Sequence, residues 1–281
     1  MPRFTTSDGL SLAWEEEGTG TPVLCLPGLT RNARDFDDLA AALAAGSPGR
    51  VRLIRLTFRG RGASDRDPTF ANYNVAIEAR DTVELLNHLA LPRATIVGTS
   101  RGGLVAMVMA ATVKDRLAGV LLNDVGPELA PAGLATIMTY LGVAPRAQDF
   151  PSVVAALKAR MTPAFPGLDD ARWTTLAHRW FDDAAGVPTL NYDPRLRDAF
   201  EAVADQPAAD LWPLFDALEG LPLALVRGAN SDLLTAESAA KMQARRPDMI
   251  FAEVPDRGHV PFLDEPPALA ALDALLAKVA A

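Results

Sequence analysis

The serine at position 100 lies in the pattern Gly-Thr-Ser-Arg-Gly, which spans residues 98–102 and could make that serine a nucleophile. The apolar run 94–97 precedes this pattern and a helical stretch, 104–112, follows it, so we expect a sharp turn from a strand into a helix. Such a turn holds a serine hydroxyl clear of the sheet and strains the backbone at the serine. The two glycines leave room for the strand and the helix to approach each other. Because the pattern G-x-S-x-G occurs once in the chain, we predict Ser100 as the nucleophile.

A serine nucleophile needs a neighbouring base, and the chain contains three histidines. His88 falls inside a helical pattern, where a packing or surface residue is expected. His178 lies in a long segment without strand-like runs. His259 follows the last strand-like run, at the carboxyl end of that strand, where ligands and catalytic groups gather in open sheets of this kind. We therefore predict His259 as the base that takes the serine proton.

Two aspartates could orient this histidine. Asp232 follows the apolar run 223–226, and Asp124 follows the run 117–122. An aspartate in this role holds one imidazole nitrogen and stabilises the imidazolium that forms during attack. Both positions follow the carboxyl end of a strand, so these patterns leave both aspartates open. The alternative role for Asp124 is to cap or anchor a loop.

Short apolar runs that alternate with helical patterns are the elements that must position these side chains. The runs themselves show no alternation of polar and apolar residues, which is typical of strands buried on both faces of a parallel sheet. They span 23–26, 51–56, 94–97, 117–122, 223–226 and 249–254. Helical periodicity lies between them, for example at 36–43, 79–86 and 269–279. This order predicts an α/β fold with a doubly wound, mostly parallel sheet.

One segment, 127–212, breaks the alternation. It holds helix-like pieces separated by prolines, many of the aromatic residues, and no convincing strand run. Structureless loops longer than about 15 residues are uncommon, so a loop does not explain it. We predict a helical cap at 127–212, inserted into a core formed by 1–126 and 213–281.

Composition excludes several other classes of protein. The 281 residues suffice for one large domain, and an apolar fraction of 49% excludes a disordered chain. Acidic residues outnumber basic ones by 35 to 27, and the net charge of −8 argues against nucleic acid as a partner. The single cysteine, Cys25, cannot form an intrachain disulfide, and no cluster of residues has the spacing of a metal site. The amino terminus is polar, and the longest apolar run, 103–111, is only about half the length of a membrane span. We therefore expect a cytoplasmic protein without a membrane partner.

With the strand–turn–helix pattern around Ser100, the sequence resembles the α/β-hydrolase superfamily, and within it the members with a helical cap. The resemblance covers essentially the whole chain, and the order nucleophile, acid, histidine agrees with it. It implies that Asp232, rather than Asp124, completes a triad with Ser100 and His259, because the family usually places the acid after that later strand.

The resemblance also implies an oxyanion hole made of two backbone amides. One is the amide of Arg101, at a helix start where free N–H groups favour an anion. The other is the amide of Leu29, which follows the run 23–26. Relatives usually show His-Gly before this position, whereas this chain has Pro27-Gly28, and the difference concerns how the loop is anchored. One such donor is worth about 3 kcal/mol.

A second glycine-rich turn, at residues 59–65, is basic and could indicate a phosphate-binding loop. It lacks the lysine and the glycine spacing of a P-loop. A similar turn shapes the loop after the same strand in α/β hydrolases, so we expect a structural role for it.

The cap would close the site and exclude water. Its predicted substrate-binding residues are Met138, Tyr140, His178, Trp180 and Phe181. The sequence therefore predicts a serine hydrolase that cleaves a small carboxylic ester or lactone through an acyl-enzyme. We expect no cofactor and no metal, and a monomer or homodimer.

Two alternatives remain open. Carbon–carbon bond hydrolases and aminopeptidases use the same triad and cap, and a ligand-binding sensor could be built on the same fold. Serine rather than aspartate at position 100 argues against epoxide hydrolase and haloalkane dehalogenase chemistry, which proceeds through an alkyl-enzyme ester.

Overall fold

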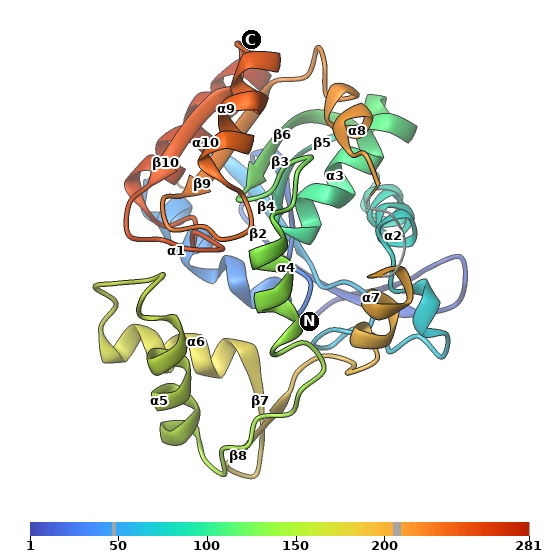
Figure 1. The fold of residues 1–281 in the computed structure, drawn as a ribbon. Helices are drawn as coiled ribbons and strands as arrows, with labels where there is room; N and C mark the ends of the chain where they lie inside the picture. Colours follow the sequence, from blue (N-terminus) through green and yellow to red (C-terminus); the bar gives the residue numbers. More distant parts are fainter. Residues whose placement is uncertain (47–48, 205–208, 281) are drawn as a thin grey trace.

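The computed structural model describes residues 1–46, 49–204 and 209–280. One sheet contains β1 (Arg3–Thr5), β2 (Ser11–Glu17), β3 (Thr21–Leu26), β4 (Val51–Leu56), β5 (Ala94–Thr99), β6 (Leu117–Asn123), β9 (Leu223–Gly228) and β10 (Ile250–Val254). The strands lie in the order β1-β2-β4-β3-β5-β6-β9-β10 (Figure 1). From β4 to β10 they are parallel, and β1 and β2 form an antiparallel edge. The predicted doubly wound, mostly parallel sheet is confirmed.

Helices cover both faces of this sheet. One face packs against α2 (Val75–His88), α3 (Arg101–Thr112) and α9 (Ala236–Arg245), and the other against α1 (Asp37–Gly46) and α10 (Pro266–Ala280). In β3, Leu24 and Leu26 join the first apolar layer, while Val23 and Cys25 join the second. The apolar runs lack alternation because every side chain of such a strand meets one of the two helix layers. None of the described helices is both long and apolar enough to cross a bilayer.

The edge strands β1 and β2 were not predicted from the sequence because neither forms an apolar run of the length seen in the central strands. β2 carries Glu15 and Glu16 beside the arginines of β4. Glu15 ion-pairs with Arg55 at 3.0 Å, and Glu16 ion-pairs with Arg52 at 2.6 Å. Cross-strand charge pairs stabilise a strand as apolar pairs do, so this polar segment is also part of the sheet.

Between β6 and β9 the chain forms helices and one hairpin. These elements are α4 (Pro131–Met138), α5 (Phe150–Met161), α6 (Asp170–Trp180), β7 (Phe181–Ala184), β8 (Val187–Leu190), α7 (Leu196–Ala204) and α8 (Trp212–Asp216). In Figure 1, α5, α6 and the β7–β8 hairpin form a lobe apart from the sheet, and this lobe has its own apolar cluster around Trp173. The expectation of no strand here is wrong: the hairpin holds one buried residue, Pro188, and so leaves no apolar pattern. The boundaries at 127 and 212 stay a prediction.

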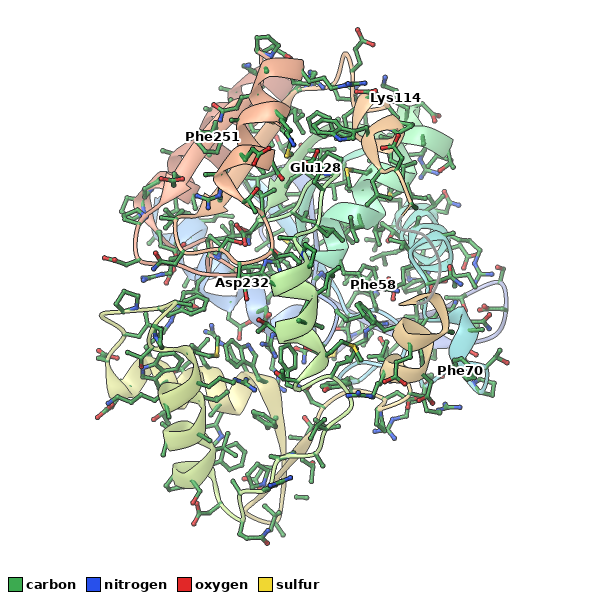
Figure 2. The ribbon with its side chains drawn as sticks, viewed as in Figure 1. Phe58, Phe70, Lys114, Glu128, Asp232 and Phe251 are labelled. Atoms are coloured by element: carbon green, nitrogen blue, oxygen red, sulfur yellow. The ribbon has the colours of Figure 1, made fainter. Side chains whose placement is uncertain are left out.

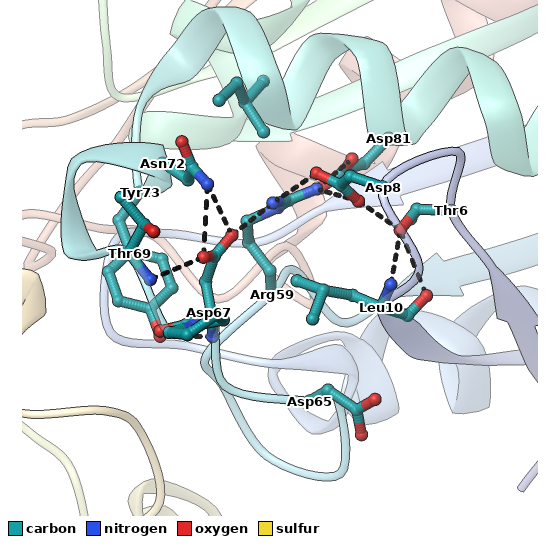
Figure 3. Close-up of polar contacts among 12 residues, drawn as sticks. Thr6, Asp8, Leu10, Arg59, Asp65, Asp67, Thr69, Asn72, Tyr73 and Asp81 are labelled. Carbon is teal, nitrogen blue, oxygen red and sulfur yellow. Dashed lines mark hydrogen bonds and ion pairs between the residues drawn. The ribbon is translucent and has the colours of Figure 1, made fainter.

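The basic turn after β4 is held by ion pairs within the protein. The guanidinium group of Arg59 is fully buried and pairs with Asp81, Asp67 and Asp8 at 2.6 to 3.0 Å (Figure 3). Arg61 is buried as well and pairs with a glutamate of α2 at 2.8 Å. Because both guanidinium groups already have carboxylate partners, this geometry agrees with a structural role for the turn and not with a phosphate site.

Candidate active site

Ser100 lies at the turn between β5 and α3, and its backbone carries the strain of that turn. Its φ angle is +51°, in the left-handed region that residues with a side chain rarely adopt. A methyl group on Gly98 would lie 2.6 Å from the carbonyl carbon of Gly102, and one on Gly102 would lie 2.1 Å from the carbonyl oxygen of Leu26. Only glycine fits at these two positions, so α3 can cross closely over β5 and β3 directly after the serine.

Ser100, His259 and Asp124 form one hydrogen-bonded chain. Ser100 Oγ lies 2.8 Å from His259 Nε2, and His259 Nδ1 lies 2.8 Å from Asp124 Oδ2. Because a carboxylate oxygen only accepts, Nδ1 carries a proton and Nε2 is left to accept from the serine hydroxyl. The three residues follow β5, β10 and β6, which are parallel strands whose carboxyl ends lie at one edge of the sheet.

Asp124 is fixed by two further donors. Its side chain is fully buried, and its φ angle of +56° is unusual for a residue other than glycine. One carboxylate oxygen accepts from the backbone N–H of Gly228 at 2.9 Å, and the other accepts from the hydroxyl of Ser231 at 2.6 Å. The loop after β9 therefore holds the carboxylate in place for the histidine.

The prediction that Asp232 orients the histidine is wrong. Asp232 is exposed beside α4 (Figure 2), and its carboxylate accepts from the hydroxyl of Thr136 at 2.8 Å. By position 232 the chain after β9 has turned toward α4, and its earlier residues Gly228 and Ser231 support Asp124 instead. Asp124 follows β6 directly, and β6 is the sheet neighbour of the strand that ends at the serine. This adjacency decides between the two aspartates, and no local pattern encodes it.

The amides of Leu29 and Arg101 lie close to the serine. Arg101 follows Ser100 in the chain, and a methyl group built on Gly28 would lie 3.8 Å from Ser100 Cβ, so the loop of Leu29 passes beside it. Over residues 1–46, 49–204 and 209–280, neither amide donates a hydrogen bond to the protein. Two free N–H donors next to a serine are the components that an oxyanion hole requires.

A buried ion-pair chain ties these two amide-bearing loops together. Arg61 Nε donates to the carbonyl oxygen of Leu29 at 2.9 Å, and Arg61 Nη1 lies 2.8 Å from Glu78 Oε1. The second oxygen of Glu78 accepts from Arg101 Nε at 2.5 Å. Burial acts to raise the pKa of Glu78, but the charges of Arg101 and Arg61 outweigh it and hold that pKa below its ordinary value. Arg61 thus anchors the loop that contains Pro27, Gly28 and Leu29.

Two adjoining cavities open at this site. The first has a volume of about 70 Å³, and Ser100 and His259 line it. The second has a volume of about 390 Å³ and is walled largely by the segment between β6 and β9. Four residues line both cavities: Thr30, Arg31, Tyr140 and Trp180. The two cavities therefore adjoin at these four residues.

The five predicted substrate-binding residues divide into two groups. Tyr140 and Trp180 line both cavities, and Phe181 lines the larger one. Met138 packs instead against the apolar cluster that contains Tyr73 and Leu141. His178 lies on the exposed side of α6 and stacks on Phe150 with ring centres 4.0 Å apart. The geometry does not support a substrate contact for Met138 or His178, because neither lines a cavity.

Sequence reasoning missed three arginines of the larger cavity, Arg31, Arg146 and Arg160. Arg31 stands two residues after Leu29, so its place next to a predicted oxyanion donor was an available signal. Arg146 and Arg160 lie in the segment between β6 and β9, and nothing in the local pattern distinguishes them from surface arginines. In the described part of the chain, no three histidine, cysteine or carboxylate side chains are grouped as metal ligands would be.

Comparison with known proteins gives consistent matches over most of the chain. A family model described as the alpha/beta hydrolase family matches residues 23–272. The chain is 36% identical to the 3-hydroxybutyrate-oligomer hydrolase of Cupriavidus necator, over 92% of this chain and 88% of that protein. It is 27% identical to the 2-(acetamidomethylene)succinate hydrolase of Mesorhizobium japonicum, over 89% of this chain and 85% of that protein. The crystal structure of an alpha/beta hydrolase from Novosphingobium aromaticivorans superimposes with a TM-score of 0.91 at 40% identity, and the match covers 99% of this chain and 97% of that one.

Proposed function

The chain belongs to the alpha/beta hydrolase family, and from this premise we propose that it is a serine hydrolase of small carboxylic esters. Ser100, His259 and Asp124 are its catalytic triad in this proposal. The observation that carries it is the pair of 2.8 Å hydrogen bonds that run from the serine through the histidine to the aspartate. The position of the serine on a strained turn between β5 and α3 supports the same role.

The proposed reaction follows from this geometry. His259 Nε2 takes the proton as Ser100 Oγ attacks the ester carbonyl carbon, and Asp124 stabilises the imidazolium. The amides of Leu29 and Arg101 donate to the tetrahedral oxyanion. The alcohol leaves with the proton from His259, and a water molecule activated by the same histidine then cleaves the acyl-enzyme and releases the acid.

Esters of 3-hydroxybutyrate are the first substrates to test. The relative at 36% identity, which aligns over nearly the whole of both chains, is a 3-hydroxybutyrate-oligomer hydrolase. Hydroxy acids are joined in such an oligomer by carboxylic ester bonds, and this is the bond that the proposed triad cleaves. A lactone contains the same bond in a ring and therefore belongs to the same test panel.

Replacement of the serine tests the proposal. We expect Ser100→Ala to reduce kcat for ester hydrolysis by about 10⁴-fold or more and to abolish labelling by a fluorophosphonate, with the circular dichroism spectrum unchanged. Ser152→Ala, which removes an exposed serine hydroxyl of α5, is the matched control and should retain both activity and labelling. If Ser100→Ala keeps wild-type turnover, Ser100 is not the nucleophile.

Substrate type separates the alternatives. A carbon–carbon bond hydrolase would turn over a vinylogous diketone faster than any ester, and an aminopeptidase would prefer an aminoacyl anilide. A ligand-binding sensor would release one equivalent of product and then stop. Repeated turnover of an ester, with slower reaction of the diketone and the anilide, is the result that we expect.

A further inference from the structure

We propose that the larger cavity is a carboxylate-binding site, in which Arg31 and Arg160 hold a negatively charged group of the substrate apart from the ester that Ser100 attacks. The inference rests on the ester hydrolysis proposed above and adds a chemical class to it. The substrate is an ester that also carries a free carboxylate, such as a half-ester of a dicarboxylic acid or an acylated hydroxy acid.

The charge of the cavity wall is the first observation. Arg31, Arg146 and Arg160 line the larger cavity, and none of its described lining residues is an aspartate or glutamate. The protein as a whole has a net charge of −8, so the positive wall runs against the overall charge. A concave surface with charges of one sign concentrates the potential and attracts a ligand of the opposite sign.

The absence of a protein partner for Arg160 is the second observation. Its guanidinium carbon lies 5.2 Å from the centre of the Tyr140 ring, and no described side chain or backbone oxygen accepts a hydrogen bond or ion pair from it. Arg160 is an exposed residue, so its guanidinium group is open to a ligand that enters the cavity. A bound carboxylate gives this group the partner that the described residues do not provide.

Arg31 connects the cavity to the nucleophile. The methyl position on Gly28 that lies 3.8 Å from Ser100 Cβ also lies 3.5 Å from Arg31 Cγ, so both side chains adjoin Gly28. Its guanidinium carbon stacks 3.9 Å above the ring of Trp180. Its single ion-pair contact within the described residues is a long one, 3.6 Å from Nε to Asp35. Stacking fixes the plane of the guanidinium group and leaves its edge available to a ligand.

Arg179 differs from Arg31 and Arg160 in its partners. It also lines the smaller cavity, but both of its terminal nitrogens donate to the carboxylate of Asp38. Its charge is therefore already neutralised by the protein. Arg31 and Arg160 have no comparable partner among the residues described, so they are free to bind an anion.

The shape and chemistry of the remaining wall favour a carboxylate on a short hydrocarbon chain. Aliphatic side chains cover much of the larger cavity: Val143, Ala147, Val153, Ala156 and Leu157. Methylene groups of a substrate pack against such a wall. The planar guanidinium group presents paired N–H donors that match the two oxygens of a carboxylate.

Matched charged and neutral esters test the proposal. One pair is mono-4-nitrophenyl glutarate and its methyl ester, with the charge on the acyl side. The other pair is 3-butanoyloxybutanoate and its methyl ester, assayed by butanoate release, with the charge on the alcohol side. The readout is the ratio of kcat/KM for the acid to kcat/KM for the methyl ester, which removes effects common to both substrates.

We expect this ratio to exceed about 10 for at least one pair in the wild-type protein. Arg160→Met should lower it by about 10- to 100-fold, and Arg160→Lys should give an intermediate value, because lysine keeps the charge and loses the paired donors. Arg245→Met, which removes an exposed arginine of α9 far from the cavity, should keep the wild-type ratio. Glutarate should also inhibit more strongly than inorganic phosphate.

Failure of the inference is distinct from failure of the proposed function. If the methyl esters are hydrolysed but the ratio is near one for both pairs, or is unchanged in Arg160→Met, the carboxylate site is wrong. Stronger inhibition by phosphate than by glutarate overturns the choice of carboxylate. If no ester is hydrolysed, the proposed function is wrong. Calorimetric titration of glutarate into the wild-type and Arg160→Met proteins then tests the carboxylate site separately. Binding to the wild type alone supports the site, and equal binding or no binding to both proteins overturns it.

Discussion

Two groups of arginines in the protein differ in their partners. In the turn after β4, Arg59 and Arg61 are fully buried, and each meets at least one carboxylate within 3.0 Å. In the larger cavity, Arg160 has no ion-pair partner among the described residues, and Arg31 has one at 3.6 Å. The protein thus contains both satisfied and unsatisfied guanidinium groups within one active-site region.

The difference shows how charge is used in the two places. A buried cation with its counter-ion in place holds loops together, as Arg61 does for the loop of Leu29. Removal of one member of such a pair leaves the other charge buried and uncompensated, which destabilises the fold. A cation without a counter-ion contributes little to the stability of the fold. We therefore expect Arg31 and Arg160 to bind an anionic ligand.

The largest effect is expected at Asp124, the acid of the proposed triad. Asp124→Asn should lower kcat for ester hydrolysis by about 10⁴-fold, because an amide in this position does not hold the histidine in the required tautomer. Asp232→Asn changes an exposed carboxylate that contacts Thr136, and its kcat should stay near the wild-type value. Steady-state kinetics on a 4-nitrophenyl ester measures both. The reverse ranking would return the triad acid to position 232.

An effect on stability is expected at the glutamate between Arg61 and Arg101. Glu78→Gln keeps the shape of the side chain and removes the charge that both arginines share, so the free energy of unfolding should fall by about 3 to 5 kcal/mol. Urea denaturation monitored by circular dichroism measures this change.

Glu201→Gln is the matched control, because Glu201 belongs to an exposed pair with Arg197 at the surface of α7 and should change the unfolding midpoint little. If Glu78→Gln has the same midpoint as this control, the buried ion-pair chain does not stabilise the active-site loops.

The smallest effect is expected for the thermal stability of a variant that lacks Arg160. Arg160→Met should leave the melting temperature nearly unchanged, since it removes an exposed charge that has no ion-pair partner among the described residues. Saturating glutarate should raise the melting temperature of the wild type but not that of the variant, because a ligand stabilises only the protein that binds it. A large drop in melting temperature for Arg160→Met without ligand would show that Arg160 has a structural role, and the comparison between the two regions would then fail.

Local patterns are sufficient for the parts of the site that depend on chain neighbours. The turn at Ser100 can be predicted from the sequence because it requires glycine two residues before and two residues after the serine. A methyl group at either position would lie 2.1 to 2.6 Å from a backbone atom. His259 can be predicted because, of the three histidines, it is the one that follows the carboxyl end of a predicted strand. The strands covered on both faces leave continuous apolar runs. In β2 a short buried stretch runs into charge-paired glutamates, and the β7–β8 hairpin is mostly exposed.

The amino-acid sequence by itself therefore determined the fold class, the serine and the histidine, since each depends on periodicity or on residues within a few positions of one another. Only the tertiary structure decided that Asp124 rather than Asp232 meets the histidine, that Glu78 joins the two amide-bearing loops, and that Arg31 and Arg160 face one cavity. These contacts join segments 17 to 135 residues apart. The order of strands across the sheet and the path of the segment between β6 and β9 bring them together, and no short stretch of sequence specifies either.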